Sequence, residues 1–304
     1  MNFNPFKKAS KPVKQVQRRQ FAGAKLDRLT SSWTTTQQSI NSDLRNGGKV
    51  LRARARDLTI NNDYARKYMQ MCVSNVVGSN GIGLQVKSKT SKGELNIKAN
   101  RQVEQGWKAW SHARNCAWDS RLSFVEMQRL FIETAARDGE VLVRMIRDES
   151  KYGFKLQFLD TNRLNEQLNK DLGNGACIKM GIEFDNTGKP VAYHISKQLD
   201  LEYIQHYQLE TERVPAESMI HAFIGERPEQ IRGSTWMASA MSRLQMLGAY
   251  EEAELVAARV GACKMGFYTS EAGDSFVGEE DEMGNLITEA EAGIFEQLPA
   301  GTSF

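Results

Sequence analysis

The stretch that decides the fold is LRARARDLTINNDYARKYMQMCVSNVVGSNGIGLQ, residues 51–85. Its middle part repeats apolar residues at steps of three and four, and this spacing is typical of one face of an α-helix. The residues on this face are Ala65, Tyr68, Met69, Cys72, Val73, Val76 and Val77. The pattern therefore predicts a helix that packs against a core.

Both ends of this helix are marked by residues with a preference for caps and turns. One of Asn61, Asn62 and Asp63 is the expected N-cap, because a short polar side chain accepts hydrogen bonds from the free N–H groups of a first turn. The expected turn residues after the helix are glycines, with Gly78 as the stop and Gly81 and Gly83 where positive φ is needed. A strand is predicted at residues 84–87.

Basic residues precede this helix. Arg52, Arg54 and Arg56 spread over a wide arc of a helix, which suits several phosphates or several acidic neighbours equally well. The net charge is only +3, but residues 1–57 hold 13 Lys/Arg against 3 Asp/Glu, whereas residues 271–304 hold 9 acids and no Lys or Arg. The two ends of the chain therefore carry opposite charge.

The composition indicates a folded protein without a membrane span or a signal segment. Hydrophobic residues at 40% and charged residues at 25% are ordinary for a chain of 304 residues with a folded core. The four cysteines are far apart and include no C-x-x-C pair, which favours reduced structural thiols. No apolar run approaches the ~18 to 20 residues of a membrane span, and the start lacks an apolar signal segment. We expect a protein that is made and kept in the cytoplasm.

Three regions follow from the pattern along the chain. Residues 1–46 lack periodicity and are expected to form a mobile basic arm, either a nucleic-acid contact or a solubilising, partner-binding tail. Residues 47–233 predict an α+β domain, with helices at 95–118 and from Ser123 to 138. Residues 234–304 predict one long helix and an acidic tail with weak strand character at 286–288 and 293–298.

The α+β domain has specific signals. Ser123 and Glu126 have the spacing of a capping box, and Val103, Trp107 and Trp110 follow helical spacing, which favours core packing over base stacking. Strands are predicted where short apolar or alternating runs occur, with a turn at 185–188. These runs are 140–147, 154–160, 178–184, 191–196 and 220–223.

The long helix at 234–263 has an unusual composition. It would be ~42 Å long at 1.5 Å per residue, and it is rich in Ala and Gly, which lets neighbouring helices approach closely. Glu251, Glu252 and Glu254 form an acidic patch on it. It is either a central core helix or a helix that packs between subunits.

Motifs for catalysis are missing from the sequence. There is no G-x-x-x-x-G-K-[ST] loop and no G-x-S-x-G elbow, and the GSNGIG stretch follows a predicted helix instead of a strand. The four histidines are not spaced as metal ligands, and His221 at the start of an apolar strand is expected to be structural. We expect no enzyme activity, no cofactor and no metal.

Ordered blocks from about residue 54 to 261 resemble the lambda-type portal proteins of tailed phages. The first block comprises Arg54, Arg56, Asp57, Leu58, Asn61, Asn62, Tyr64, Ala65, Arg66 and the VVGSNGIGLQ exit. The later blocks are Trp118-Asp119, Phe124, Gln128, Arg137-Asp138-Gly139-Glu140, Leu159-Asp160, Tyr193-His194-Ile195 and HAFIGERPEQIRGSTWMASAM.

The resemblance implies a structural subunit of a ring of twelve copies at one capsid vertex, which conducts double-stranded DNA and joins head to tail. It implies a wing-like domain, a stem-like helix and the start of a clip, with the chain the N-terminal part of a longer protein. The implied partners are the terminase, the capsid or scaffold protein and head-completion proteins, in the virion and, during assembly, in the host cytoplasm. The rival hypothesis is a cytoplasmic DNA-binding or DNA-processing protein that uses the basic arm together with Arg52, Arg54 and Arg56.

Overall fold

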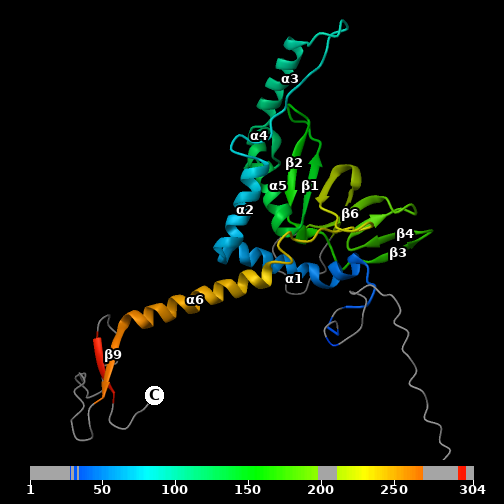
Figure 1. Ribbon diagram of the computed structural model, residues 1–304. Coiled ribbons are helices and arrows are strands. Elements are labelled where there is room, and N and C mark those ends of the chain that lie inside the picture. The colour runs from blue at the N-terminus through cyan, green and yellow to red at the C-terminus, as the bar shows by residue number, and fades with distance from the viewer. Residues whose placement is uncertain (1–27, 29–30, 33, 198–210, 270–293, 299–304) are drawn as a thin grey trace, which may run out of the picture. The chain divides into compact units, whose positions relative to one another are not determined.

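The computed structural model describes residues 28, 31–32, 34–197, 211–269 and 294–298, of which 263–269 and 294–298 are described by their backbone (Figure 1). The chain divides into two units, residues 1–39 and 40–304. All the elements below belong to the second unit. The basic arm expected at 1–46 lies mostly outside the described residues, and its expected end falls inside the first helix, which begins at Ile40.

Three helices build one side of this unit. They are α1 (Ile40–Asn61), α2 (Asp63–Val76) and α5 (Phe124–Asp138). Their shared core is formed by small and flexible apolar side chains, with Ala55, Ala65 and Ala136 fully buried and Met69 and Met241 nearly so. Small residues at these positions let the helix backbones approach closely. The predicted apolar face of α2 is confirmed only in part, because Tyr68 and Val76 are 38% and 51% exposed.

The helix ends follow the capping signals. Asn62 is the N-cap of α2 and accepts a hydrogen bond from the Ala65 N–H at 3.0 Å. Gly78 and Gly81 have φ of +71° and +73°, as expected, whereas Gly83 is not among the positive-φ residues. Ser123 and Glu126 form the capping box of α5.

The strand predicted at 84–87 is wrong. This segment has no strand partner and is instead fastened by side chains of the next helix, α3 (Ile97–Trp110). The Val86 N–H donates to Glu104 and the Ser88 N–H to Asn100. Val86 and Ser88 therefore donate to side chains of α3 instead of to a neighbouring strand.

The helix predicted at 95–118 is shorter and broken. It consists of α3 and the single turn α4 (Ala113–Cys116), with Ser111 as the C-cap of α3. Trp107 and Trp110 pack on each other and on Phe124 with ring centroids 5.0 to 5.2 Å apart. Their assignment to the core is confirmed.

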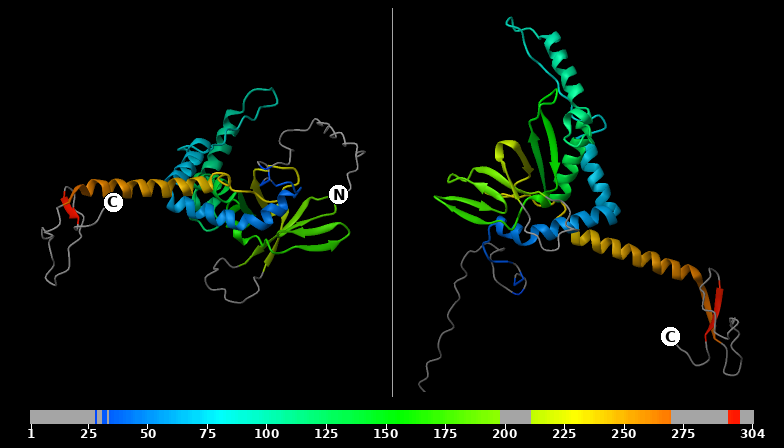
Figure 2. Two further views of the ribbon diagram at one scale, coloured as in Figure 1. Left: turned by 60° about the horizontal axis from the view of Figure 1, so that its bottom comes forward. Right: turned by 180° about the vertical axis from the view of Figure 1, so that it is seen from behind.

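Two antiparallel sheets adjoin the helices. The three-stranded sheet has the order β2-β1-β8 and is composed of β1 (Glu140–Ile146), β2 (Lys155–Leu159) and β8 (Met219–Phe223). The five-stranded sheet runs in sequence order from β3 to β7. Its strands are β3 (Lys170–Gly173), β4 (Ala176–Lys179), β5 (Ile182–Phe184), β6 (Pro190–Ser196) and β7 (Thr211–Pro215). Figure 2 shows α5 alongside β1 and β2, and the short 3₁₀ turns η2 (Thr161–Arg163) and η3 (Ala216–Ser218) follow β2 and β7.

The segment predicted as one strand at 178–184 is two strands. Met180 and Gly181, with φ of +46° and +80°, reverse the chain between β4 and β5. The larger core lies between the two sheets and includes Leu142, Ile182, Tyr193 and Val214. The turn predicted at 185–188 is confirmed between β5 and β6. The α+β class is likewise confirmed.

The last helix, α6 (Met241–Cys263), has 23 residues and starts later than predicted. Residues 236–240 form turns instead, because the Thr235 hydroxyl and the Trp236 N–H both donate to the Ala136 carbonyl at the end of α5. After α6, β9 (Lys264–Thr269) pairs in parallel with β10 (Ile294–Leu298). The weak strand predicted at 286–288 lies outside the described residues.

Candidate functional site

Arg52 faces the protein interior. Its side chain is 5% exposed and donates to a Glu166 carboxylate oxygen at 2.6 Å and to the Asn162 amide oxygen at 3.2 Å. α1 places Arg52 opposite the segment that follows β2. A guanidinium held by these two partners is not available to a phosphate.

Arg56 lies one turn further along α1 and is also neutralised. It binds both carboxylate oxygens of Asp138 at 3.0 and 2.7 Å and reaches Asp160 at 3.0 Å. Burial of Asp138 opposes its ionisation, but hydrogen bonds from Arg56 and Arg137 outweigh this effect and lower its pKa. The Asp138 bond, in turn, raises the pKa of Arg56. The pair fastens α1 to the end of α5.

Arg54 points elsewhere. It is exposed and has no ion-pair partner within the part of the chain that the structure describes. The sequence left open whether these arginines bind phosphates or acidic neighbours, and Arg52 and Arg56 bind acidic neighbours. The structure does not bring the three arginines together at one site.

A buried charge cluster that sequence reasoning missed lies at the start of β1. The Glu140 side chain is fully buried and is bound by Arg232, whose side chain is 4% exposed, through Nε at 2.8 and 2.9 Å. His221 Nε2 lies 3.0 Å from Glu140, and the Gly233 N–H donates to the same carboxylate at 3.0 Å. Arg232 also contacts Glu166 at 3.1 Å, which connects this cluster to Arg52.

The electrostatics of this cluster favour its charged form. Burial opposes ionisation of Glu140, but Arg232 and His221 outweigh it and hold the pKa of Glu140 well below its ordinary value. Arg232 keeps a raised pKa in spite of its own burial, because Glu140 and Glu166 face it. One signal was present in the sequence: Glu140 is a charged residue at the start of a mainly apolar strand, and His221 is the one polar residue of β8.

Two glycines let the chain close over this cluster. A Cβ atom on Gly139, whose φ is +90°, would lie 2.3 Å from the Ser234 carbonyl carbon. A Cβ atom on Gly233 would lie 2.1 Å from the Gly139 carbonyl oxygen. Only glycine fits at either position, so the loop before α6 is pressed against the junction of α5 and β1.

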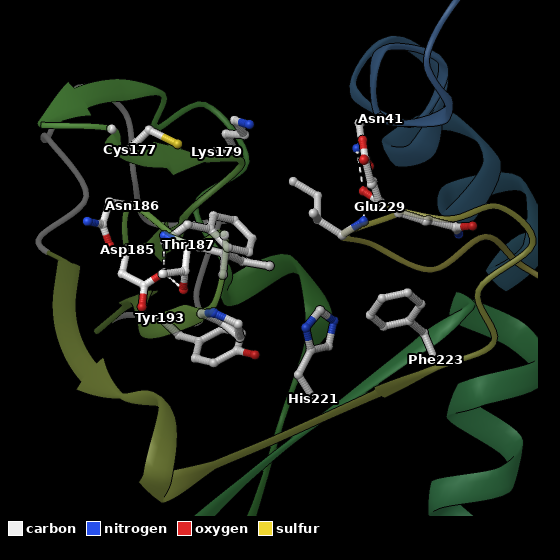
Figure 3. Close-up of a pocket in the computed structure, with 17 residues that line it drawn as sticks. Asn41, Cys177, Lys179, Asp185, Asn186, Thr187, Tyr193, His221, Phe223 and Glu229 are labelled. Carbon is white, nitrogen blue, oxygen red and sulfur yellow. Dashed lines mark hydrogen bonds between the residues drawn. The ribbon is translucent and has the colours of Figure 1, made fainter. Parts of the chain in front are cut away.

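A cleft of about 740 Å³ opens beside the cluster, between the five-stranded sheet and the loop at 229–231 (Figure 3). Its apolar wall includes Phe184, Tyr193 and Phe223, and Asp185 folds back on Thr187 at its rim. His221 lines the cleft but is engaged with Glu140, which confirms its structural role. Across the described residues, no group of three or more His, Cys, Asp or Glu side chains gathers to hold a metal ion.

Most of the helix α6 is exposed, although it carries many apolar side chains. Met241 is buried and Leu244 is half-buried in the core, but large apolar residues further along the helix are 39% to 71% exposed. These residues are Met246, Leu247, Tyr250, Leu255, Val256 and Val260. At about 100° per residue they lie on all sides of the helix. None of the described helices is both long and apolar enough to cross a membrane.

The three glutamates predicted on this helix are not equivalent. Glu251 accepts a hydrogen bond from the Tyr64 hydroxyl of α2 at 2.6 Å, and this bond raises the pKa of Tyr64. Glu252 and Glu254 are exposed and have no ion-pair partner among the described residues.

The buried charged groups described above join elements of this unit to one another, and α6 exposes apolar side chains along most of its described length. The chain matches the model of the phage portal protein, lambda family, over residues 26–304. It belongs to this family.

Named relatives agree with this assignment. The probable portal protein of Halomonas phage phiHAP-1 is 36% identical over 94% of this chain and 57% of its own length. Portal protein B of Escherichia phage lambda is 26% identical over 76% of this chain and 45% of its own length. The portal protein of Escherichia phage N15 is 25% identical over the same share of both chains. The chain therefore spans about half the length of these curated relatives.

Proposed function

We propose that copies of this protein form a ring at one capsid vertex, which conducts double-stranded DNA during packaging and ejection and joins head to tail. The proposal rests on the portal family and on one observation in the structure. Beyond its first turn, α6 exposes apolar side chains on all its sides. Burying such side chains stabilises a contact by roughly 25 cal/mol per Å² of apolar area.

Second copies of α6 are the proposed cover for this helix. Its Ala and Gly residues permit close approach of neighbouring helices, and a heterologous contact that repeats around an axis closes into a ring. In the ring, α6 is a stem-like helix, residues 47–233 form the wing-like domain, and the acidic residues after α6 begin a clip-like segment. The expected number of copies is twelve.

The same helix fits a role beside DNA. A conduit must release its cargo, and each phosphate bound by Lys or Arg adds affinity and salt dependence. Glu252 and Glu254 are exposed on α6 and would repel a phosphate backbone, so DNA could slide past them. The chain performs no chemistry in this account. The terminase supplies the energy, and the capsid or scaffold and the head-completion proteins are the other partners.

The rival DNA-binding hypothesis loses two of its residues. Arg52 and Arg56 are engaged with Glu166, Asp138 and Asp160. Only Arg54 of this group is exposed, and one exposed arginine on a helix does not make a phosphate-binding surface. The basic residues before Ile40 remain as its other support.

Sedimentation velocity of matched variants tests the proposal. Leu255→Glu places a charge on the exposed face of α6, and Ile97→Glu makes the same change at an equally exposed position in the first turn of α3, where an acid suits the helix dipole. We expect the wild type and Ile97→Glu to sediment as one large species and Leu255→Glu as monomers. A wild type that remains monomeric and shifts a DNA duplex in a gel would favour the rival.

A further inference from the structure

A groove of about 760 Å³ lies between α2 and α5 and shares no lining residue with the cleft or with α6. Its floor includes Met69, which is 4% exposed, and Val73, which is half-buried. The end of α1 contributes Ile60 at the rim. Volumes of ~300 to 1,000 Å³ are typical of sites that receive a ligand.

Arginines dominate the charge of this groove. Arg66, Arg129 and Arg137 line it together with a single carboxylate, Glu133. Arg137 is paired with Glu133 at 3.5 Å and with the buried Asp138 at 3.1 Å. The two other arginines are therefore the cations available to an incoming group.

These two arginines differ in how firmly they are held. Arg129 donates to the backbone carbonyls of Gly78 and Ser79 at the C-terminal end of α2, so its guanidinium is fixed without a neutralising partner there. Glu126 also interacts electrostatically with Arg129 without an ion pair, and one of its carboxylate oxygens, Oε2, accepts hydrogen bonds from the hydroxyl and the backbone N–H of Ser123. Arg66 is exposed and has no ion-pair partner in the described part of the chain.

We propose that this groove binds an acidic segment of a partner protein, with carboxylates on Arg66 and Arg129 and an apolar side chain on Met69 and Val73. Guanidinium groups bind carboxylates through two parallel hydrogen bonds. The apolar floor needs an apolar side chain beside the acids, and a protein segment supplies both.

A DNA backbone fits this groove less well. A duplex, whose grooves alone are about 6 to 12 Å wide, cannot enter a concave site of this size and would touch only its rim. Its phosphates would leave the apolar floor uncovered. We therefore assign the site to a peptide, and make DNA an outcome of the test.

Fluorescence anisotropy with the purified chain tests this assignment. The probe is a labelled synthetic peptide, GEEDEMGNLITEAE, which combines six acids with apolar residues and has the sequence of residues 278–291. The control peptide carries Gln and Asn in place of the acids. Arg66→Glu removes a groove cation, Ser74→Glu adds a carboxylate at the exposed groove position Ser74, and Lys67→Glu makes the same charge reversal as Arg66→Glu beside the groove.

We expect the acidic peptide to bind and the control peptide not to bind. Arg66→Glu and Ser74→Glu should each weaken binding by about fivefold or more, and Lys67→Glu by less than about twofold. Equal weakening by all three variants would show unspecific attraction and overturn the site, as would failure of the acidic peptide to bind at millimolar concentration. A labelled duplex that binds instead of the peptide, and is lost in Arg66→Glu, would reassign the groove to nucleic acid.

Discussion

Replacing Arg232 by leucine tests the buried charge cluster most sharply. The change leaves the Glu140 carboxylate, which has no exposed surface, with His221 and the Gly233 N–H as its remaining partners. Removing one partner of a buried ion pair typically costs ~3 to 5 kcal/mol. This is a large part of the ~5 to 15 kcal/mol that stabilises an ordinary domain.

An exposed ion pair provides the matched control. Arg213 pairs with Glu183 at 2.8 Å, but its side chain is 50% exposed. Arg213→Leu should therefore cost no more than ~1 kcal/mol. Both variants are compared by urea unfolding in the Leu255→Glu background, so that assembly does not contribute to the measured stability.

The pH dependence of the stability loss in Arg232→Leu provides a second, independent test. In the wild type the pKa of Glu140 is lowered, so its contribution is present above the ordinary carboxyl pKa of ~4.3 and is lost as the pH falls through the lower folded value. In Arg232→Leu, burial without the arginine raises that pKa. The penalty of the variant should then be largest near neutral pH and shrink toward pH ~4.5. A cost equal to that of Arg213→Leu, or one that grows as the pH falls, would refute the reasoning.

Three further comparisons concern single positions. Arg56→Leu should lower the free energy of unfolding by ~3 kcal/mol and Arg54→Leu by less than ~0.5 kcal/mol, since only Arg56 has a buried acidic partner, Asp138; equal losses in urea melts would contradict this. Gly139→Ala should lower the stability by more than the ~1 to 3 kcal/mol of backbone strain alone, because the added Cβ clashes with the loop before α6. Gly188→Ala, at a similar φ but in open space, should lower it only by that strain, and thermal melts compare the two variants. Ala257→Trp, on the exposed part of α6, should reduce the assembled fraction in sedimentation while leaving the melting temperature of the monomer unchanged, and loss of monomer stability alone would make α6 a core helix.

Local signals in the sequence were enough to predict most of the helices. Asn62, Ser123 with Glu126, and Gly78 act through hydrogen bonds and backbone angles within a few residues, so their roles are legible without the tertiary structure. The end of α5 at Gly139 follows the same logic. The α+β class could be predicted because short apolar or alternating runs follow these helices along the chain.

Elements that depend on distant partners were missed. β3 is exposed along its whole length and β7 is short and mixed in burial, so neither shows the alternation that marks a half-buried strand. The strand predicted at 178–184 was split by Met180, a non-glycine residue in the left-handed region that sequence gives no reason to expect there. The start of α6 was displaced because Ala136, about 100 residues earlier, captures the preceding turn.

The positions of the charged residues could be predicted from the sequence, but their partners could not. Spacing places Arg52, Arg54 and Arg56 on one helix, but only the fold decides that two of them meet Glu166 and Asp138 and that the third faces solvent. Glu251 likewise differs from Glu252 and Glu254 only because Tyr64 of another helix reaches it. Pairings across some 80 to 190 residues are not encoded in any local pattern.

Electron microscopy of the purified protein tests whether α6 is covered by its copies in a ring. We predict closed rings of one size for the wild type and for Ile97→Glu, and none for Leu255→Glu. Compact monomers in all three samples, with the α6 amides protected from hydrogen exchange in the monomer, would show that the helix is covered by its own chain and would contradict the account.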